Sequence, residues 1–430
     1  MLWKNPFLQK DNYDKAVYWC LLITLLSLAF SIRFINSISV FILVAITLLH
    51  PDRKMFFKRA FRNPYLIVCI ALFATKMAGL YYTEHMDASM RQVGTKIIWM
   101  AIPFFFCSNK NIPASDMWRL MFRFTIALFA VSLYCLVYAL FIYAQQHDVS
   151  VFFYHELVRP VKHHAVLFSL YLLFCIIYWM EEGLAITGNH SQRTLLTSLI
   201  IFFFLFIILL ASKLIIAITF LYVIFFGLKF FLKKRNIALL LFTSFVLGIL
   251  LILTVTKNPI KDRFKDLANG SVGLFKQEKF SPDVYFNGLQ FRLLIWRFTY
   301  EILNEKKAWL LGVSTGDAQI ELNKKYVAAN MYQGNGRDDK KGYLVFNCHN
   351  VFLQTALESG LIGLFIVISI IVIFIVQAVQ RRRRSTLIFF TAILAFCFTE
   401  SVLSSQYTIL LFMFFPLLSL NTGISKEDQL

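Results

Sequence analysis

The sequence predicts an all-α membrane protein: a polytopic bundle of about twelve transmembrane helices with one large, partly helical loop. Hydrophobic residues make up 58% of the 430 residues, and charged residues make up only 16%. Many apolar residues fall in unbroken runs, and about 20 such residues are enough for a helix to cross the bilayer core. Backbone groups in lipid must bond internally, so these runs are expected to be helices and not open sheet.

Twelve apolar runs are the expected spans, and they divide the chain into three parts. Spans fill residues 1–255, a large loop fills 256–350, and further spans fill 351–430. The second and fourth runs are short, and Ser212-Lys213 predicts a tight turn between two spans. The runs lie near 16–32, 34–50, 64–82, 95–107, 117–144, 164–180, 194–211, 214–232, 237–255, 360–380, 386–399 and 407–421.

The short loops between the runs predict the orientation in the membrane. Lysine and arginine accumulate in the cytoplasmic loops of membrane proteins. Residues 53–62, 233–235 and 381–384 are rich in both, whereas the alternate loops hold few. We therefore expect both termini in the cytoplasm and the large loop 256–350 outside it.

The formal net charge of +19 indicates anionic partners. A basic balance can indicate nucleic acid, anionic lipids or phosphate-bearing ligands. Because many of these cations sit in short loops between spans, where they set topology, we expect membrane lipids as partners and no nucleic acid.

His349-Asn350, where the large loop meets the tenth span, is the first candidate for chemistry. A neutral imidazole at a membrane boundary can accept a proton at neutral pH. The alternative is a residue at a helix N-terminus that bonds only to local backbone. Taken alone, the pattern favours this structural role.

Arg292 and Arg297 lie on a segment, 289–304, whose apolar and polar residues alternate at helical spacing. Such a segment predicts an amphipathic helix at the membrane interface. A guanidinium presents a rigid fork of donors that matches phosphate geometry. The alternative is an arginine that reaches toward lipid headgroups, and for Arg297 we favour that alternative.

Several other ionisable residues lie at span edges or in the predicted outer loops. Lys213 has apolar spans on both sides, so it is either functional or a lysine that reaches water from a short turn. The loop around Arg159, His163 and His164 forms a cationic mouth for an anionic ligand. Its spacing does not match HExxH, so no metal is expected there. Further ionisable residues at or near span edges are Lys76, Lys96 and Glu400.

The order of these motifs resembles the O-antigen ligase and polymerase family of bacterial cell-surface polysaccharide assembly. The strongest match is His349-Asn350 followed by 358–363, an E-x-G-x-x-G pattern that opens a span. Weaker matches are Ser212-Lys213 at the tight turn, 258–264 at the start of the large loop, 291–296 as an arginine-bearing helix, 312–317 as a GxGxGD-like turn, and Glu400-Ser401.

Two positions depart from the family's pattern. Lys213 stands where arginine is usual, which removes the bidentate fork that arginine offers to phosphate. His163-His164-Ala165 differs from the His-Pro-like pattern of some relatives, so the resemblance implies least about the residue roles in this loop.

The resemblance implies an enzyme of the bacterial inner membrane with its active site on the periplasmic face. It would move a glycan from a polyprenyl (undecaprenyl) diphosphate carrier to an acceptor hydroxyl such as that of lipid A-core, with inversion and without a metal or cofactor. His349 would be the general base. Diphosphate binding would fall to Arg292 and Lys213, helped by Arg159 and Arg263, with Asn350, His163, His164, Glu400 and Arg297 as supporting residues.

Two other functions remain open. A polymerase of the same family has the same layout but extends the glycan on its carrier; the single large late loop leans slightly toward a ligase. A flippase of lipid-linked sugars belongs to another class. Transporters tend to show two similar halves, whereas this chain has one asymmetric loop.

Overall fold

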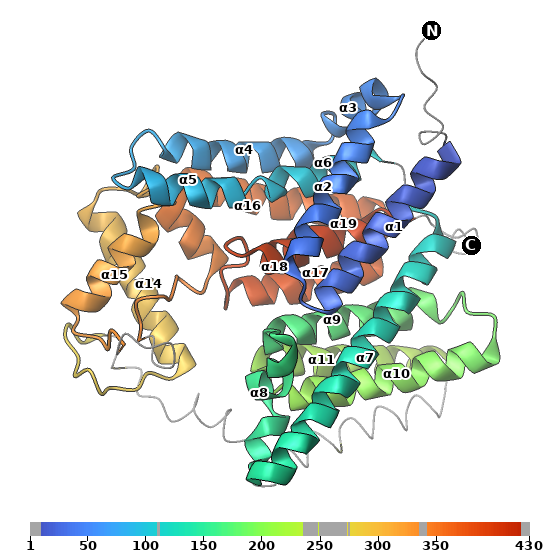
Figure 1. Ribbon diagram of the computed structural model, residues 1–430. Coiled ribbons are helices and arrows are strands. Elements are labelled where there is room, and N and C mark those ends of the chain that lie inside the picture. The colour runs from blue at the N-terminus through green and yellow to red at the C-terminus, as the bar shows by residue number, and fades with distance from the viewer. Residues whose placement is uncertain are drawn as a thin grey trace. The chain divides into compact units, whose positions relative to one another are not determined.

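The computed structural model describes residues 10–109, 112–234, 276–334 and 342–422, together with positions 248 and 273. Over these residues the regular structure is helical (Figure 1). The described part contains no strand, only an isolated bridge between Ile112 and Thr422. The predicted all-α class is confirmed.

The chain divides into two compact units, which we describe separately. The first comprises Met1–Thr24, Arg33–Asp116 and Gly270–Leu430. It contains most of α1 (Lys10–Ala29), α2 (Arg33–Leu49), α3 (Arg53–Ala60), α4 (Pro64–Gly79), α5 (Met86–Thr95), α6 (Ile98–Ser108), α14 (Gly288–Glu305), α15 (Ala318–Ala328), α16 (Val351–Gln380), α17 (Arg384–Cys397), α18 (Gln406–Ile409), a π-helical turn at Leu410–Phe414, and α19 (Phe415–Leu420).

Helices α4 and α16 form an antiparallel pair in the first unit (Figure 1). Asn63 caps α4 by accepting a hydrogen bond from the Tyr65 backbone N–H at 3.0 Å, and Pro64 takes the first helical position, where its missing N–H is tolerated. The Asn63 side chain also accepts from Gln377 near the end of α16, at 2.8 Å. At the opposite end of α4, Thr75 lies 3.5 Å from Ser359. These two contacts fix the antiparallel register.

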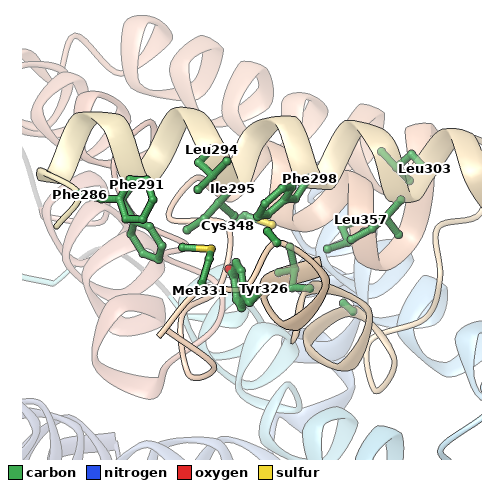
Figure 2. Close-up of a cluster of buried hydrophobic side chains, with 14 of the residues drawn as sticks. Phe286, Phe291, Leu294, Ile295, Phe298, Leu303, Tyr326, Met331, Cys348 and Leu357 are labelled. Carbon is green, nitrogen blue, oxygen red and sulfur yellow. The ribbon is translucent and has the colours of Figure 1, made fainter. Parts of the chain in front are cut away.

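Helix α14 covers the segment 289–304 that was predicted to be amphipathic, but its apolar face is buried inside the protein. Asn287 and Gln290 form a reciprocal capping box at its start. Its buried side chains, among them Leu294 and Phe298, pack against Tyr326 of α15 and against residues near α16 (Figure 2). The expected interfacial face is therefore used as a core, because α15 and the segment before α16 cover it.

Two glycines let the large-loop segment contact the backbone of α16. Gly360 has φ +63° and ψ −163°, which breaks α16 there. A Cβ on Gly360 would lie 2.2 Å from the Leu310 backbone, and a Cβ on Gly312 would lie 2.4 Å from the Ser359 nitrogen. The freed N–H of Leu361 donates to the Trp309 carbonyl at 2.7 Å. Only glycine permits this approach.

The second unit comprises Leu25–Ile32 and Met117–Asn269. It contains most of α7 (Ala114–Gln146), then α8 (Tyr154–Val158), α9 (Ala165–Tyr178) with a π-helical continuation at Trp179–Gly183, α10 (His190–Leu209) and α11 (Lys213–Lys234). The turn between α10 and α11 is as tight as predicted, and Ala211 adopts φ +47° in it.

Every predicted span except the ninth coincides with a described helix; the ninth, 237–255, lies outside the described residues apart from position 248. Four described helices are long and apolar enough to cross a membrane: α7, α9 with its continuation, α10 and α16. The pair α2 and α3, bent by 117°, makes a fifth if it is one span. The count of twelve spans is thus not confirmed, since helices such as α4 and α17 are apolar but shorter.

Candidate functional site

His349 and Arg292 approach the same carboxylate, that of Glu400. His349 Nδ1 lies 3.0 Å from Glu400 Oε2, and Arg292 Nη2 lies 3.5 Å from Glu400 Oε1. The side chains are 20% (His349), 28% (Arg292) and 25% (Glu400) exposed. The cluster is thus enclosed enough for charges to interact strongly and open enough to meet a ligand.

The loop before α16 fixes the position of the imidazole. His349 has φ +45°, a conformation that non-glycine residues rarely adopt. Its N–H donates to the Asn347 side chain at 3.0 Å, and the hydroxyl of Ser401 donates to the same oxygen at 3.1 Å. The backbone next to His349 and the backbone next to Glu400 are therefore tied together, which holds the two side chains in register.

Of His349 and Asn350, it is Asn350 that has the structural role at the helix N-terminus. Its side chain caps α16 by accepting from the N–H groups of Phe352 and Leu353, at 2.9 and 3.1 Å. Because Asn350 is the cap, the imidazole of His349 does not fill that role and is free to contact Glu400.

The carboxylate determines which nitrogen of His349 can accept a proton. An ionised carboxylate only accepts hydrogen bonds, so Nδ1 carries the proton in this pair and Nε2 keeps its lone pair. A carboxylate in this place also stabilises the imidazolium that forms when Nε2 takes up a proton. With Glu400 at its Nδ1, the neutral imidazole of His349 can therefore accept a proton at Nε2.

Arg292 is held by backbone oxygens on two sides. Nε donates to the Thr399 carbonyl at 3.2 Å, and Nη1 donates to the Gly288 carbonyl at 2.8 Å. With Nη2 directed at Glu400, three of the five guanidinium N–H groups point at protein oxygens. Two remain for an anionic ligand, on a side chain whose position is already fixed.

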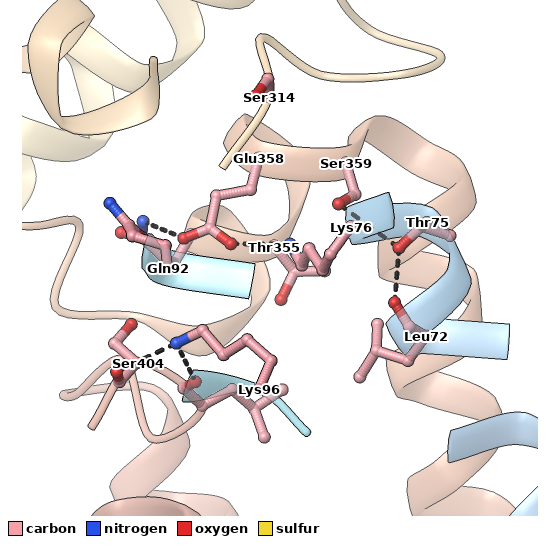
Figure 3. A network of polar contacts seen from close by, with 12 residues as sticks. Leu72, Thr75, Lys76, Gln92, Lys96, Ser314, Thr355, Glu358, Ser359 and Ser404 are labelled. Carbon is pink, nitrogen blue, oxygen red and sulfur yellow. Dashed lines mark hydrogen bonds and ion pairs between the residues drawn. The ribbon is translucent and has the colours of Figure 1, made fainter. Parts of the chain in front are cut away.

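A buried chain of polar contacts connects α4 to the residue that precedes His349. Figure 3 shows its members Lys76 and Glu358. Lys76 Nζ and Glu358 Oε2 lie 2.6 Å apart, and both side chains are almost completely buried. The Gln354 amide donates to Glu358 Oε1 at 2.6 Å, and its own oxygen accepts from the Cys348 N–H at 3.0 Å. Thus α4 is connected through α16 to the residue next to His349.

A second buried lysine supports the segment that follows Glu400. Lys96 Nζ donates to the carbonyls of Leu403 and Ser404, at 2.9 and 3.0 Å (Figure 3). Lys96 and Lys76 both face the ring of Trp99, at 5.5 and 5.9 Å from its centre. The two lysines that the sequence marked only as ionisable groups at span edges therefore support the two loops that carry the site.

The Lys76–Glu358 pair leads to a stability prediction. Replacing Lys76 by methionine keeps the volume but leaves Glu358 buried without its counter-charge, and breaking a buried pair in this way costs about 3–5 kcal/mol. The double variant Lys76→Met/Glu358→Gln should recover a large part of that loss. Unfolding of the purified protein in detergent measures both; equal stability of the two variants would show that the pair contributes as hydrogen bonds and not as charges.

The turn at 312–317 docks on the segment before α5. Asp317 accepts hydrogen bonds from the Thr83 hydroxyl at 3.0 Å and the Glu84 N–H at 2.9 Å, and it pairs with His85 Nδ1 at 2.7 Å. The Gly316 N–H donates to the Ser89 hydroxyl at 3.1 Å. The aspartate of this motif is thus an anchor, since its oxygens are directed at protein groups.

The other predicted site residues lie elsewhere. Arg297 pairs with Glu301 on its own helix at 3.1 Å and donates to the Gln277 carbonyl at 2.8 Å. Arg159 forms an exposed pair with Glu156 at 3.2 Å. The pair of Arg159 is exposed, where such pairs contribute little, whereas the Arg297 side chain is only 20% exposed.

The two histidines of the predicted cationic mouth differ from each other. His163 is buried and its Nε2 lies 3.0 Å from the Ala29 carbonyl oxygen. Burial lowers the pKa of His163 to about 4, so this ring is neutral at neutral pH and adds no positive charge. His164 is exposed, with its ring 4.6 Å from that of His155.

Three expectations about the site stay predictions. Lys213 begins α11, and both Lys213 and Arg159 belong to the second unit. A position of either residue beside His349 therefore stays a prediction. Arg263 lies outside the described residues. Within residues 10–109, 112–234, 276–334 and 342–422, no group of three or more His, Cys, Asp or Glu side chains could hold a metal ion. That transfer needs no metal nevertheless stays a prediction.

Sequence reasoning missed some of the groups that position the site. Gln354 and Asn347 were not singled out, because a polar side chain near a helix start carries no signal of its partner. Asp317 stood in the GxGxGD-like turn, but nothing in that pattern paired it with residues 83–85. Glu358 stood in a recognised motif, but nothing in the pattern paired it with Lys76, 282 positions away. Buried ionisable residues in apolar helices were the signal that could have led to the pair.

In this helical protein a histidine and an arginine thus lie beside one carboxylate. Residues 196–368 match the family model described as O-antigen ligase. This segment is therefore similar to the O-antigen ligase family, which confirms the predicted resemblance. The family's function is membrane glycosyl transfer of the ligase or polymerase type, on lipid-linked glycans. Arg292 and His349 lie inside the matched segment, and Glu400 follows it. A search of curated proteins finds no match.

Proposed function

We propose that the protein is a ligase-type glycan transferase of the bacterial inner membrane, acting on its periplasmic face. The donor is a glycan on a polyprenyl (undecaprenyl) diphosphate, and the acceptor is a hydroxyl such as that of lipid A-core. The observation that supports the proposal is that His349 and Arg292, both inside the segment that matches the family model, approach the carboxylate of Glu400.

The proposed step is a direct displacement. The acceptor hydroxyl oxygen attacks the anomeric carbon, the bond from that carbon to the diphosphate oxygen breaks, and the hydroxyl proton passes to Nε2 of His349. The polyprenyl diphosphate leaves with the bonding electron pair, and attack from the opposite face inverts the anomeric centre. General-base assistance of this kind contributes about 10²–10⁴-fold to a rate.

Arg292 acts on the leaving group in this proposal. Negative charge on the diphosphate grows as the glycosidic bond breaks, so a cation that is already in place stabilises the transition state more than the ground state. The backbone contacts of Arg292 hold it there before the substrate binds, which avoids reorganisation during the reaction. Lys213, Arg159 and Arg263 are proposed as further cations for the same diphosphate.

The decisive experiment is transfer in vitro with purified full-length protein, a lipid-linked donor and a lipid A-core acceptor. We expect the acceptor to gain the glycan without a second enzyme. Longer glycans on the carrier, with an unchanged acceptor, would identify a polymerase. Movement of the donor across a vesicle membrane with no new glycosidic bond would identify a flippase and overturn the proposal.

A further inference from the structure

The first unit contains a basic cleft where α4 begins and α16 ends. It has a volume of about 860 Å³, within the range of sites that hold small ligands. Three arginines, Arg59, Arg62 and Arg381, line it together with amide side chains that include Asn63 and Gln380. No carboxylate is among its described lining residues. The cleft therefore carries concentrated positive charge.

The arginines of this basic cleft are bonded only to neutral oxygens. Arg59 donates to the Ser108 carbonyl at 2.9 Å, and Arg381 donates to the Leu420 carbonyl at 3.3 Å and the Asn421 side chain at 3.2 Å. Arg62 is exposed, and its side chain makes no hydrogen bond or ion pair with the described part of the chain. No described carboxylate pairs with any of the three, so their charge is not compensated within the described residues.

The start of α4 adds to the positive potential of the cleft. Pro64, the first residue of α4, is one of its lining residues. Pro64 has no N–H and the Tyr65 N–H donates to the Asn63 side chain, so the start of α4 contributes the positive end of the helix dipole, which favours anions, and no unpaired donors. Two independent features, the arginines and the helix start, thus act in the same direction.

The basic cleft lies about one bilayer core away from the candidate active site. Along α16, the segment from Ser359 to Gln377 spans about 27 Å at 1.5 Å per residue, and the hydrocarbon core of a bilayer is about 30 Å thick. Ser359 contacts the end of α4 near the site, whereas Gln377 contacts the start of α4 at the cleft. In a bilayer that α16 crosses, the cleft would thus lie at the headgroup level of the leaflet opposite to the site.

We propose that the basic cleft binds a phosphate-bearing anion, and that the anion at this depth is the headgroup of an anionic phospholipid. Arginine recognises phosphate through its planar fork of donors. Basic pockets between membrane helices hold lipid headgroups in this way. A soluble phosphate ester carries the same chemistry, so the experiment separates the two sources. This binding is independent of glycan transfer and is measured without it.

The test titrates purified full-length protein in a neutral detergent with phosphatidylglycerol, phosphatidylcholine or glycerol 3-phosphate, and follows binding by native mass spectrometry and thermal stabilisation. We expect saturable binding of phosphatidylglycerol. Arg62→Gln should weaken it about fivefold, since a cation at the membrane surface contributes about 1 kcal/mol. Adding Arg381→Gln should weaken it further. The control Arg53→Gln removes an exposed arginine of α3 that does not line the cleft, and should change affinity by less than about twofold.

The variants decide between a built site and diffuse surface charge. Because the Arg62 side chain has no hydrogen bond or ion pair to lose among the described residues, Arg62→Gln tests the cleft even if Arg381→Gln disturbs the end of α19. Equal binding of phosphatidylcholine, or an equal effect of Arg53→Gln, would overturn the proposal. Saturable binding of glycerol 3-phosphate that is lost in Arg62→Gln would support the phosphate site and assign it to a soluble ligand.

Discussion

Replacing His349 by alanine is expected to lower the rate of glycan transfer by about a thousandfold while the protein stays folded. The imidazole is the group that we propose takes the proton of the acceptor hydroxyl, and general bases contribute about 10²–10⁴-fold. Its ring makes few packing contacts that alanine would remove: Phe291 and Phe346 lie 6.5 and 5.5 Å from it, centre to centre. Initial rates with saturating donor measure the loss.

The matched control is His190→Ala, which removes an exposed histidine at the start of α10. We expect it to retain near-normal activity. Near-normal transfer by His349→Ala would exclude His349 as the base and leave the similarity of residues 196–368 to the O-antigen ligase family unaffected. An unfolding midpoint close to that of the unchanged protein would show that a loss of activity comes from chemistry and not from misfolding.

Replacing Glu400 by glutamine is expected to lower the rate about a hundredfold or more, although the shape of the side chain is kept. The amide can turn its NH₂ group toward His349, which makes Nδ1 an acceptor and leaves Nε2 protonated and unable to act as a base. The change also removes the charge that stabilises the imidazolium. Transfer rates across a range of pH would separate this from a simple loss of binding.

The control for Glu400 is Glu305→Gln, an exposed carboxylate of α14 that pairs with Lys325 at 2.6 Å. It should leave transfer within about twofold of normal, as exposed pairs contribute little. If Glu400→Gln raised KM alone and left kcat unchanged, Glu400 would act through Arg292 and donor binding, and the proposed orientation of His349 would be wrong.

The sequence predicted most helices because their apolar runs are local features. Helices α7, α10 and α16 cover the predicted positions, and the turn at Ser212-Lys213 is where two adjacent runs require it. The number of spans was harder to predict, since short apolar helices such as α4 and α17 resemble spans in composition but not in length.

The site could be predicted in part. His349 and Arg292 stood out because their motifs resemble those of the O-antigen ligase family, whereas the pattern around His349 alone favoured a structural role. Glu400 was expected only as a supporting residue, since no pattern shows that a carboxylate 51 positions after His349 contacts it. The sequence counted His163 in a cationic mouth, and its neutrality could not be predicted, because its burial depends on packing around Ala29.

The pairing of Lys76 with Glu358 has a consequence for biosynthesis. The two residues are 282 positions apart, so at about 5–20 residues per second Lys76 leaves the ribosome about 15–60 s before its partner. An unpaired lysine in an apolar helix is unfavourable in lipid. Helix α4 therefore cannot reach its final, fully neutralised position until α16 has been made. During that interval the nascent chain must keep the end of α4 near water or near the insertion machinery.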